Sequence, residues 1–393
     1  MLEGSIVDYF TAQSNLDSST AAARHLIEQL LAHSAAAPTL LMLYFSERYE
    51  ADLLRRALRQ AFPDTPLVGC SSCQAVRTAL PGEVPVALAA IYDPQGAYGV
   101  AGGSSGEGDV RRWLRQAMAA CGRPGELPQM VLLHTTPGGE EALLAELDEE
   151  LGGAVPVIGG SAGDDTLSGQ WRLCWQQQTL TEGSVLAVFY PDCELVFQFH
   201  AGYRPTGHSA IVTRAEGREV INLDERPAAE VYGEWVGQVW PEGPVLHETT
   251  FFPLARHAGE MYGMPCFKLS HPESVTARHG VRLFTDIHEG ERLVLMQGSE
   301  TGVLERSLLA ARIEPAYGMP EKLHPIGALI IFCAGYRYAL AGRVDEIIGH
   351  YNERLGGVPY LIPFTFGEQG RMPQGELVHG NLMISSVIFC RGA

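Results

Sequence analysis

Hydrophobic and polar positions along the chain form blocks that indicate strands and helices in alternation. Residues 38–45 (PTLLMLYF) are almost continuously apolar, as in a strand that is buried on both faces. Apolar side chains recur at helical spacing in residues 49–62, and residues 67–73 then lead a strand into a glycine turn. This order predicts parallel strands joined by a crossover helix, because a tight turn cannot connect parallel strands.

The same plan recurs ninety positions later without a gap. Leu132 corresponds to Met42, and residues 157–161 (VIGGS) correspond to residues 67–71 (LVGCS). Two related strand-helix-strand units are the economical interpretation, and they predict an α/β first half.

The pattern changes after the second unit. Strands are predicted at 170–176, 183–190 and 195–201, separated by turn residues that favour antiparallel pairing. Later strands and helices are mixed, with strands at 293–297, 327–333 and 383–390 and helices at 228–237, 302–313 and 343–355. The sequence therefore predicts two closely packed domains, an α/β domain over residues 1–190 and a mixed α/β domain of α+β character over residues 191–393.

Charge and hydropathy narrow the function classes. Lys and Arg total 28 against 46 Asp and Glu, so the net charge is −18 and no basic run offers a nucleic-acid or anionic-membrane surface. The N-terminal residues lack the pattern of a signal peptide, and no window of about 18 apolar residues predicts membrane insertion. We expect a cytoplasmic protein whose eight cysteines are thiols. A homodimer is compatible with the sequence.

Several short motifs, in family order, resemble those of FIST proteins. They are 68–72 (VGCSS), 158–165 (IGGSAGDD), 202–207 (GYRPTG), 212–213 (VT), 222–228 (NLDERPA), 252–254 (FPL), 332–337 (FCAGYR) and 365–370 (TFGEQG). The chain departs from the family pattern at Cys73 and Gln74, and at His379 and Asn381, which a glycine separates. The resemblance implies an N-terminal and a C-terminal FIST domain, which form a sensory module of bacterial signalling proteins.

The resemblance also implies partners and a cofactor. One subgroup of stand-alone FIST proteins, the nitric-oxide-sensing NosP proteins, binds heme and works with histidine kinases. This sequence carries no F-box, kinase, receiver or GGDEF segment, so we expect a stand-alone sensor that acts through a partner histidine kinase. Membership of the subgroup would make it a heme b protein that senses nitric oxide.

Heme needs an apolar slot and an axial ligand, most often a neutral imidazole. His208 is the first choice as axial ligand to the metal, because it follows the 202–207 motif; His200 and His247 are the next choices. Arg204 could hold a heme propionate through a bidentate pair. For any single histidine, a hydrogen-bonded or exposed imidazole is the commoner alternative.

The two glycine turns give a second hypothesis, a heme-free sensor of a small carboxylate or amino acid. Free backbone N–H groups at the ends of parallel strands can hold an anion. The alternative is that glycine serves only the backbone there and that the serines cap the next segment. Arg337 and Glu368, inside family motifs, could hold a polar ligand or pair across the two halves. The candidate ligand-binding residues are Gly69, Cys70, Ser71, Ser72, Gly160, Ser161, Arg337 and Glu368.

A third hypothesis is a cysteine-dependent enzyme that uses Cys70. Cys70 and Cys73 form a C-x-x-C, which is compatible with inert buried thiols, a redox pair or two ligands of a zinc site. No H-E-x-x-H or P-loop occurs, and G-x-S-x-G at 102–106 and 159–163 lacks the strand-turn-helix context of a nucleophile elbow. A sensor rather than an enzyme is therefore the preferred hypothesis.

Overall fold

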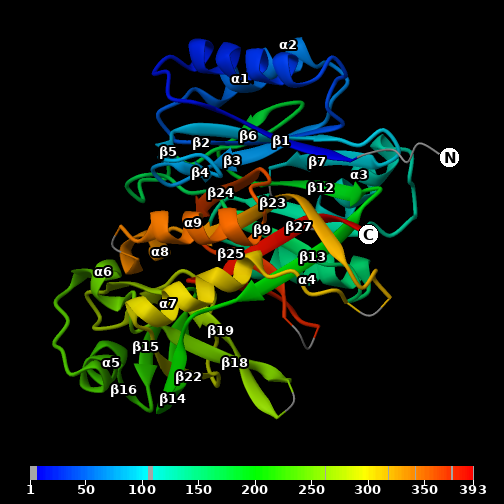
Figure 1. Ribbon diagram of the computed structural model, residues 1–393. Helices are drawn as coiled ribbons and strands as arrows, with labels where there is room; N and C mark the ends of the chain where they lie inside the picture. Colours follow the sequence, from blue (N-terminus) through cyan, green and yellow to red (C-terminus); the bar gives the residue numbers. More distant parts are fainter. Residues whose placement is uncertain are drawn as a thin grey trace.

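Four β-sheets with helices packed against them make up the computed structural model, which describes residues 7–104, 109–261, 263–316, 318–340, 342–372 and 375–392 (Figure 1). Three of the sheets have six strands each and share one buried core. The fourth sheet lies to one side of them. Within these ranges no helix is long and apolar enough to span a bilayer.

The first sheet carries the N-terminal helices on its outer face, at the top of Figure 1. Its strands, in spatial order, are β1 (Asp8–Ser14), β6 (Val86–Tyr92), β2 (Leu40–Phe45), β3 (Leu67–Ser71), β10 (Leu173–Trp175) and β11 (Thr179–Leu180). Helices α1 (Ser19–His33) and α2 (Ala51–Ala61) bury Leu26, Leu54 and Leu58 against Leu41 and Leu43 of β2.

The second sheet repeats this layout. Its strands, in the same spatial order, are β7 (Ala97–Gly103), β12 (Ser184–Tyr190), β8 (Met130–Thr135), β9 (Val157–Ser161), β25 (Glu368–Arg371) and β26 (Leu377–Gly380). Helices α3 (Asp109–Ala120) and α4 (Glu140–Leu151) pack Trp113 and Leu147 onto Leu133.

The third sheet has the layout once more. Its strands are β13 (Glu194–His200), β27 (Ile384–Gly392), β23 (Leu323–Cys333), β24 (Tyr360–Thr365), β4 (Val76–Thr78) and β5 (Glu83–Val84). Its helical segments are α7 (Glu300–Ser307), a 3-10 turn (Leu308–Ala311), α8 (Gly335–Ala339) and α9 (Val344–Arg354).

The three sheets are copies of one unit, because each has the same order of antiparallel, antiparallel, parallel, antiparallel and antiparallel neighbours. The last two strands of each sheet form a hairpin that comes from a different unit. The hairpin after β3 completes the third sheet, the hairpin after β9 completes the first, and the hairpin after β24 completes the second. This cyclic exchange ties the three units into one body.

The fourth sheet is an insertion into the third unit, between β13 and α7, and we call residues 204–297 the inserted sheet. Its strands are β14 (Arg204–Glu216), β15 (Glu219–Leu223), β16 (Arg226–Pro227), β17 (Gly243–Pro244), β18 (Leu254–Met261), β19 (Met264–Ser270), β20 (Pro272–Val275), β21 (Val281–Leu283) and β22 (Arg292–Gln297). Helices α5 (Ala228–Val236) and α6 (Leu246–Thr249) accompany it. All of its strand pairs are antiparallel, and it occupies the lower left of Figure 1.

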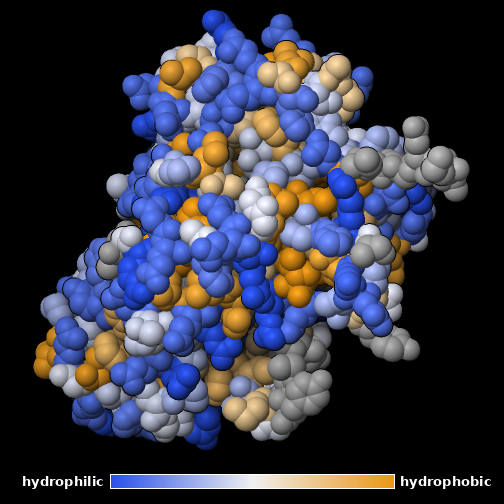
Figure 2. All heavy atoms as spheres, viewed as in Figure 1, coloured by the Kyte–Doolittle hydropathy of each residue, from blue (hydrophilic) through white to orange (hydrophobic). Residues whose placement is uncertain are grey.

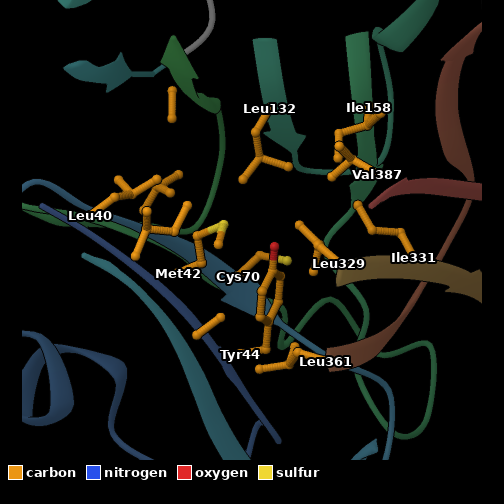
Figure 3. Close-up of a cluster of buried hydrophobic side chains, with 14 of the residues drawn as sticks. Leu40, Met42, Tyr44, Cys70, Leu132, Ile158, Leu329, Ile331, Leu361 and Val387 are labelled. Carbon is orange, nitrogen blue, oxygen red and sulfur yellow. The ribbon is translucent and has the colours of Figure 1, made fainter. Parts of the chain in front are cut away.

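The core lies where the three six-stranded sheets face one another. Figure 3 shows side chains from all three sheets meeting there, and those labelled in it are at most 3% exposed. The labelled residues are Leu40, Met42, Tyr44, Cys70, Leu132, Ile158, Leu329, Ile331, Leu361 and Val387. A core shared in this way stabilises the units jointly, since no unit buries its inner face alone.

The predicted mixed α/β class and the ninety-residue repeat are confirmed. Tyr44 pairs with Cys70 in the first unit, and His134 pairs with Gly160 at the same position of the second. One expectation needs correction: the strands predicted at 170–176, 183–190 and 195–201 are antiparallel to their partners but lie in three different sheets. The boundary expected at residue 190 falls between the second unit, which ends with β12, and the third.

Candidate functional site

The turns that follow the inner parallel strands of the three units meet at one place. The Ser71 hydroxyl donates to the Gly163 carbonyl at 2.7 Å, and the Gly163 N–H donates back to the Ser71 carbonyl at 3.1 Å. The Cys73 N–H donates to the Phe364 carbonyl at 2.9 Å, and the Ser161 N–H to the Gly367 carbonyl at 2.9 Å. Each turn is therefore bonded to the other two, and Ser71, Ser72 and Ser161 of the expected glycine-turn residues lie at their junction.

The glycines of these turns allow close backbone approach. A Cβ atom at Gly69 would lie 1.8 Å from the Leu43 carbonyl oxygen, and one at Gly160 would lie 2.4 Å from the Thr365 hydroxyl. The N–H groups of the turns are not free for an anion: those of Ser71, Ser72 and Ser161 all donate to backbone carbonyls. The amide nest expected from the sequence is thus replaced by a hydrogen-bonded junction: residues beside the exchanged strands β10 and β25 accept from Ser71 and Ser161, and Phe45 of β2 accepts from Ser72.

A cavity of about 500 Å³ opens beside this junction, and we call it the turn cavity. It lies between the three-unit body and the inserted sheet, since both contribute to its wall. From the body come Cys73, 164–167, 333–335, Phe366 and Asn381; from the inserted sheet come Pro244, 246–248, His271, Glu273, Ser274 and Phe284. Its volume falls within the usual range for small-molecule sites.

Arg218 of the inserted sheet joins it to the second unit. The guanidinium contacts Glu140 at the start of α4, and it lies 3.1 Å from the Glu141 carboxylate and 2.8 Å from that of Asp286. The Asp286 N–H also donates to the Glu141 carboxylate at 2.9 Å. The inserted sheet is therefore tied to the body by charged groups close to the cavity.

The wall of the turn cavity is acidic. Among the described lining residues Asp164, Asp165, Glu248 and Glu273 carry carboxylates, and no Lys or Arg occurs. Burial raises the pKa of Glu273, against the opposing effect of Arg282 and Arg218.

The two histidines of the wall differ in their surroundings. Burial lowers the pKa of His271 to about 4, so this imidazole is neutral at pH 7; its Nε2 lies 3.1 Å from the Leu246 carbonyl oxygen. His247 is exposed at the rim. The rest of the wall is apolar or aromatic, except for Thr166, Ser274, Asn381 and the thiols of Cys73 and Cys333.

The structure separates the residues expected to hold heme. His208 and Arg204 lie exposed on β14, outside the lining of the turn cavity, and the His208 ring stacks on Trp235 with centroids 6.1 Å apart. Of these candidates, His247 is the one that lines the turn cavity. His200 is partly buried at the end of β13, where the desolvation of its ring lowers its pKa to about 4 and neither ring nitrogen has a hydrogen-bond partner among the described residues.

These surroundings do not fit a heme. An exposed strand gives His208 no apolar slot. The acidic wall beside His247 would repel the propionates, and Arg204 does not reach it. The His200 nitrogens have no hydrogen-bond partner among the described residues, but His200 does not line the turn cavity.

Arg337 and Glu368 have structural partners. Arg337 lies 2.9 Å from the Glu83 carboxylate and stacks 4.9 Å over the Phe364 ring, so it ties the first-unit hairpin to the third unit. Glu368 is fully buried, and burial raises its pKa well above the usual value although Thr365 donates a hydrogen bond to it at 2.9 Å. Neither residue lines the turn cavity.

The two cysteines of the C-x-x-C lie in different surroundings. Cys70 is in the core, where burial first and then the neighbouring Cys174 raise its pKa well above the ordinary value. Cys73 lines the turn cavity, and burial raises its pKa to about 12. Both therefore stay protonated at neutral pH. Ser161 is also fully buried, with its hydroxyl donating to Glu140 at 2.9 Å.

Several cavity residues escaped the sequence-based selection. Asp164 and Asp165 stand directly after the second glycine turn, so their position offered a signal that was not used. His271, Glu273 and Phe284 offered none, because only the folding of the inserted sheet brings them to the turns.

Similarity to other proteins covers most of the chain. The FIST N domain matches residues 39–226, and the FIST C domain matches residues 228–371. An uncharacterized protein of Mycobacterium tuberculosis is 25% identical over 249 residues, which are 61% of this chain and 62% of that protein. An uncharacterized protein of Methanocaldococcus jannaschii is 31% identical over 99 residues, 25% of this chain and 19% of its own length.

Among solved structures, the crystal structure of cyanuric acid hydrolase from A. caulinodans matches with a TM-score of 0.38 at 10% identity, covering 98% of this chain and 100% of that one.

The residues that line the turn cavity fall in both FIST domains, Cys73 and Asp164 in the first and Glu273 and Phe366 in the second. The chain belongs to the FIST family, whose domains sense ligands in signal transduction.

Proposed function

We propose that this protein senses a small molecule that binds in the turn cavity, and that it passes the binding event to a partner protein. The observation that carries this proposal is the composition of the wall, to which both FIST domains contribute. A ligand held there contacts the body and the inserted sheet at the same time.

Binding would act on the balance between two arrangements of the inserted sheet. In the closed arrangement, Asp164 of the body and Glu273 of the inserted sheet both contact the ligand. A ligand that binds this arrangement more tightly than the open one shifts the equilibrium toward it. The pairs between Arg218 and the α4 carboxylates lie in the same interface, so they would be made or broken with it. The surface of the inserted sheet is then the part of the protein that passes the change to the partner.

A histidine kinase is the partner that we propose, on the strength of the family resemblance. The heme-based version, in which nitric oxide is the signal, rests on that resemblance as well. The surroundings of His208, His200 and His247 favour the heme-free version.

The catalytic alternative has less support. A thiol nucleophile must be deprotonated and accessible. Burial keeps Cys70 protonated, and it places this thiol in the core rather than in the turn cavity.

Thermal unfolding with a panel of small amines, amino acids, carboxylates and sugars tests the proposal. Binding to the folded state alone raises the unfolding temperature as the ligand concentration exceeds its dissociation constant. Ser274→Trp, which fills the cavity, should abolish the shift. Ala120→Trp, at the exposed end of α3, should retain it. Equal shifts in both variants would contradict binding in the turn cavity.

A further inference from the structure

The charge of the turn cavity restricts the ligand. Four carboxylates line it, and the described part of its wall has no cationic side chain. Glu47 adds a fifth acidic group just behind the wall, since its carboxylate accepts the Asp165 N–H at 2.9 Å. An anion would meet repulsion here, whereas a cation would be attracted.

Asp164 carries an unfilled hydrogen-bonding position. The residue is 0% exposed and lines the turn cavity. Its Oδ2 accepts the N–H groups of Ser168 at 3.0 Å and Gln170 at 2.7 Å, whereas its Oδ1 has no partner among the described residues. A buried carboxylate oxygen without a donor is costly. A ligand that brings an N–H donor would remove that cost.

Cations behind the wall have other acidic partners nearby. Arg337 opposes the rise in the pKa of Cys73, but it pairs with Glu83. Arg218 opposes the rise in the pKa of Glu273, but its guanidinium contacts Glu140, Glu141 and Asp286. Arg282 also opposes the rise in the pKa of Glu273, from an exposed position on β21. The neutral state of His271 adds no positive charge. The cavity therefore retains an excess of negative charge.

The walls favour an organic cation over a metal ion. Across the described ranges, no group of three or more His, Cys, Asp and Glu side chains is arranged to hold a metal. Phe284, Phe366, Leu246 and Leu167 supply apolar and aromatic surface between the acids. Aromatic faces attract ammonium groups and accommodate an apolar body.

We propose that the turn cavity binds a small organic ammonium ion, with Asp164 accepting its N–H and Glu273 acting as a second acidic contact. This inference rests on the proposed function and specifies the ligand class of the same site. It differs from the small carboxylate or amino acid expected at the glycine turns in requiring a positive charge and no carboxylate.

Calorimetric titration with three probes of similar size and different charge tests the inference: 2-phenylethylamine as its ammonium form, 3-phenylpropanol and 3-phenylpropionate. We expect saturable binding of one 2-phenylethylammonium per chain and no measurable binding of the other two. In Asp164→Asn, whose amide oxygen can still accept the Ser168 and Gln170 N–H groups, the dissociation constant should rise at least about tenfold. In Glu273→Gln the dissociation constant should rise to the same extent, and this substitution leaves the hydrogen bonds of Ser168 and Gln170 to Asp164 in place.

The matched control is Glu28→Gln on the exposed side of α1. It changes the net charge by the same amount, so it corrects for the general attraction of cations to a chain of net charge −18. Its dissociation constant should stay within about twofold of the original value. An equal loss in all three variants would overturn the inference.

Two further outcomes separate this inference from the proposed function. If 3-phenylpropionate binds and Ser274→Trp blocks it, the ligand class is wrong and sensing in the turn cavity stands. If Ser274→Trp leaves 2-phenylethylammonium binding unchanged, the turn cavity is not the site and both proposals fail. Binding that is lost in Asp164→Asn and Glu273→Gln, but not in Glu28→Gln, supports both.

Discussion

The Tyr44 hydroxyl lies 2.9 Å from Nε2 of His134, and the two residues occupy the same position in the first two units. His134 Nδ1 lies 3.0 Å from the Gly160 carbonyl oxygen. A carbonyl can only accept, so Nδ1 carries the proton and Nε2 accepts from Tyr44. A buried hydrogen bond thus joins equivalent positions of the first two units.

Tyr44→Phe removes the donor and leaves the His134 nitrogen buried without a partner. We expect the free energy of unfolding to fall by about 1–3 kcal/mol. Tyr92→Phe is the matched control, because its buried hydroxyl has no hydrogen-bond partner within the described ranges. Urea unfolding of both variants measures the difference. Equal losses would mean that the Tyr44 hydrogen bond contributes nothing specific.

The stability of the protein should fall on acidification. Burial lowers the pKa of His134, His200 and His271 to about 4 in the folded state, against about 6.5 in an unfolded chain. Between these values the unfolded state binds more protons, so stability is complete above about pH 6.5 and is lost as the pH falls toward 4. Each histidine contributes a slope of up to about 1.4 kcal/mol per pH unit.

Comparison of His134→Gln with the original protein isolates one of these contributions. Carboxyl groups with raised pKa values have the opposite effect on the pH dependence, but both proteins contain them, so their effect cancels in the difference. Its unfolding free energy should depend less steeply on pH between 4 and 6.5 than that of the original protein. His288→Gln, at an exposed position, should leave the slope unchanged. A slope that both variants share with the original protein would show that His134 is not buried as a neutral imidazole.

Gly69→Ala should be severely destabilising. Its Cβ atom would lie 1.8 Å from a backbone carbonyl of β2, which can move only if the parallel pair separates. We expect a loss of more than about 4 kcal/mol or a failure to fold. Gly349→Ala in α9 meets no atom within 4 Å and should stabilise the protein by about 0.5–1 kcal/mol. Thermal unfolding of the two proteins tests the contrast.

Heme binding can be tested at the residue that the sequence favoured. Because His208 is exposed and stacked on Trp235, we expect His208→Ala to leave the absorbance spectrum after heme addition unchanged. Sharp, saturating Soret absorption at one heme per chain, lost in His208→Ala but not in His247→Ala, would show that the sequence-based choice was right. Dithionite and nitric oxide should then shift that band.

Thiol reactivity should follow burial. Cys70, Cys73, Cys174, Cys333 and Cys390 are buried, whereas Cys121, Cys193 and Cys266 are partly exposed. We expect a thiol probe at neutral pH to label Cys121 and Cys266 first, Cys193 more slowly because burial raises its pKa to about 12, and all eight cysteines after unfolding. Cys70→Ala should leave native labelling unchanged. Fast labelling that this substitution removes would revive the cysteine-dependent hypothesis.

Much of the fold was predictable because it is written in local patterns. The buried strand at 38–45, the helix at 49–62 and the strand leading into the turn at 67 appear as β2, α2 and β3. The repeat was found because its two copies are separated by a constant ninety residues. The third copy was not found, because the inserted sheet of 204–297 separates β13 from β23 and removes that constant spacing.

The cavity shows where local reasoning ends. Glycine turns are visible in the sequence, but whether their N–H groups are free depends on which strands pair with them. Strand exchange between units brings in β10 and β25 as neighbours of β3 and β9. These pairings join residues about a hundred or more positions apart, so no local pattern encodes them.

The sequence by itself determined the α/β class, the duplicated unit, the acidic character and the membership of the FIST family, because each depends on residues close together or on composition. Only the tertiary structure decided the threefold repetition, the exchange of hairpins and the turn cavity. Asp164 and Glu273, for example, meet there from segments more than a hundred residues apart. Their proximity follows from packing the inserted sheet onto the body, a long-range event that neither segment specifies alone.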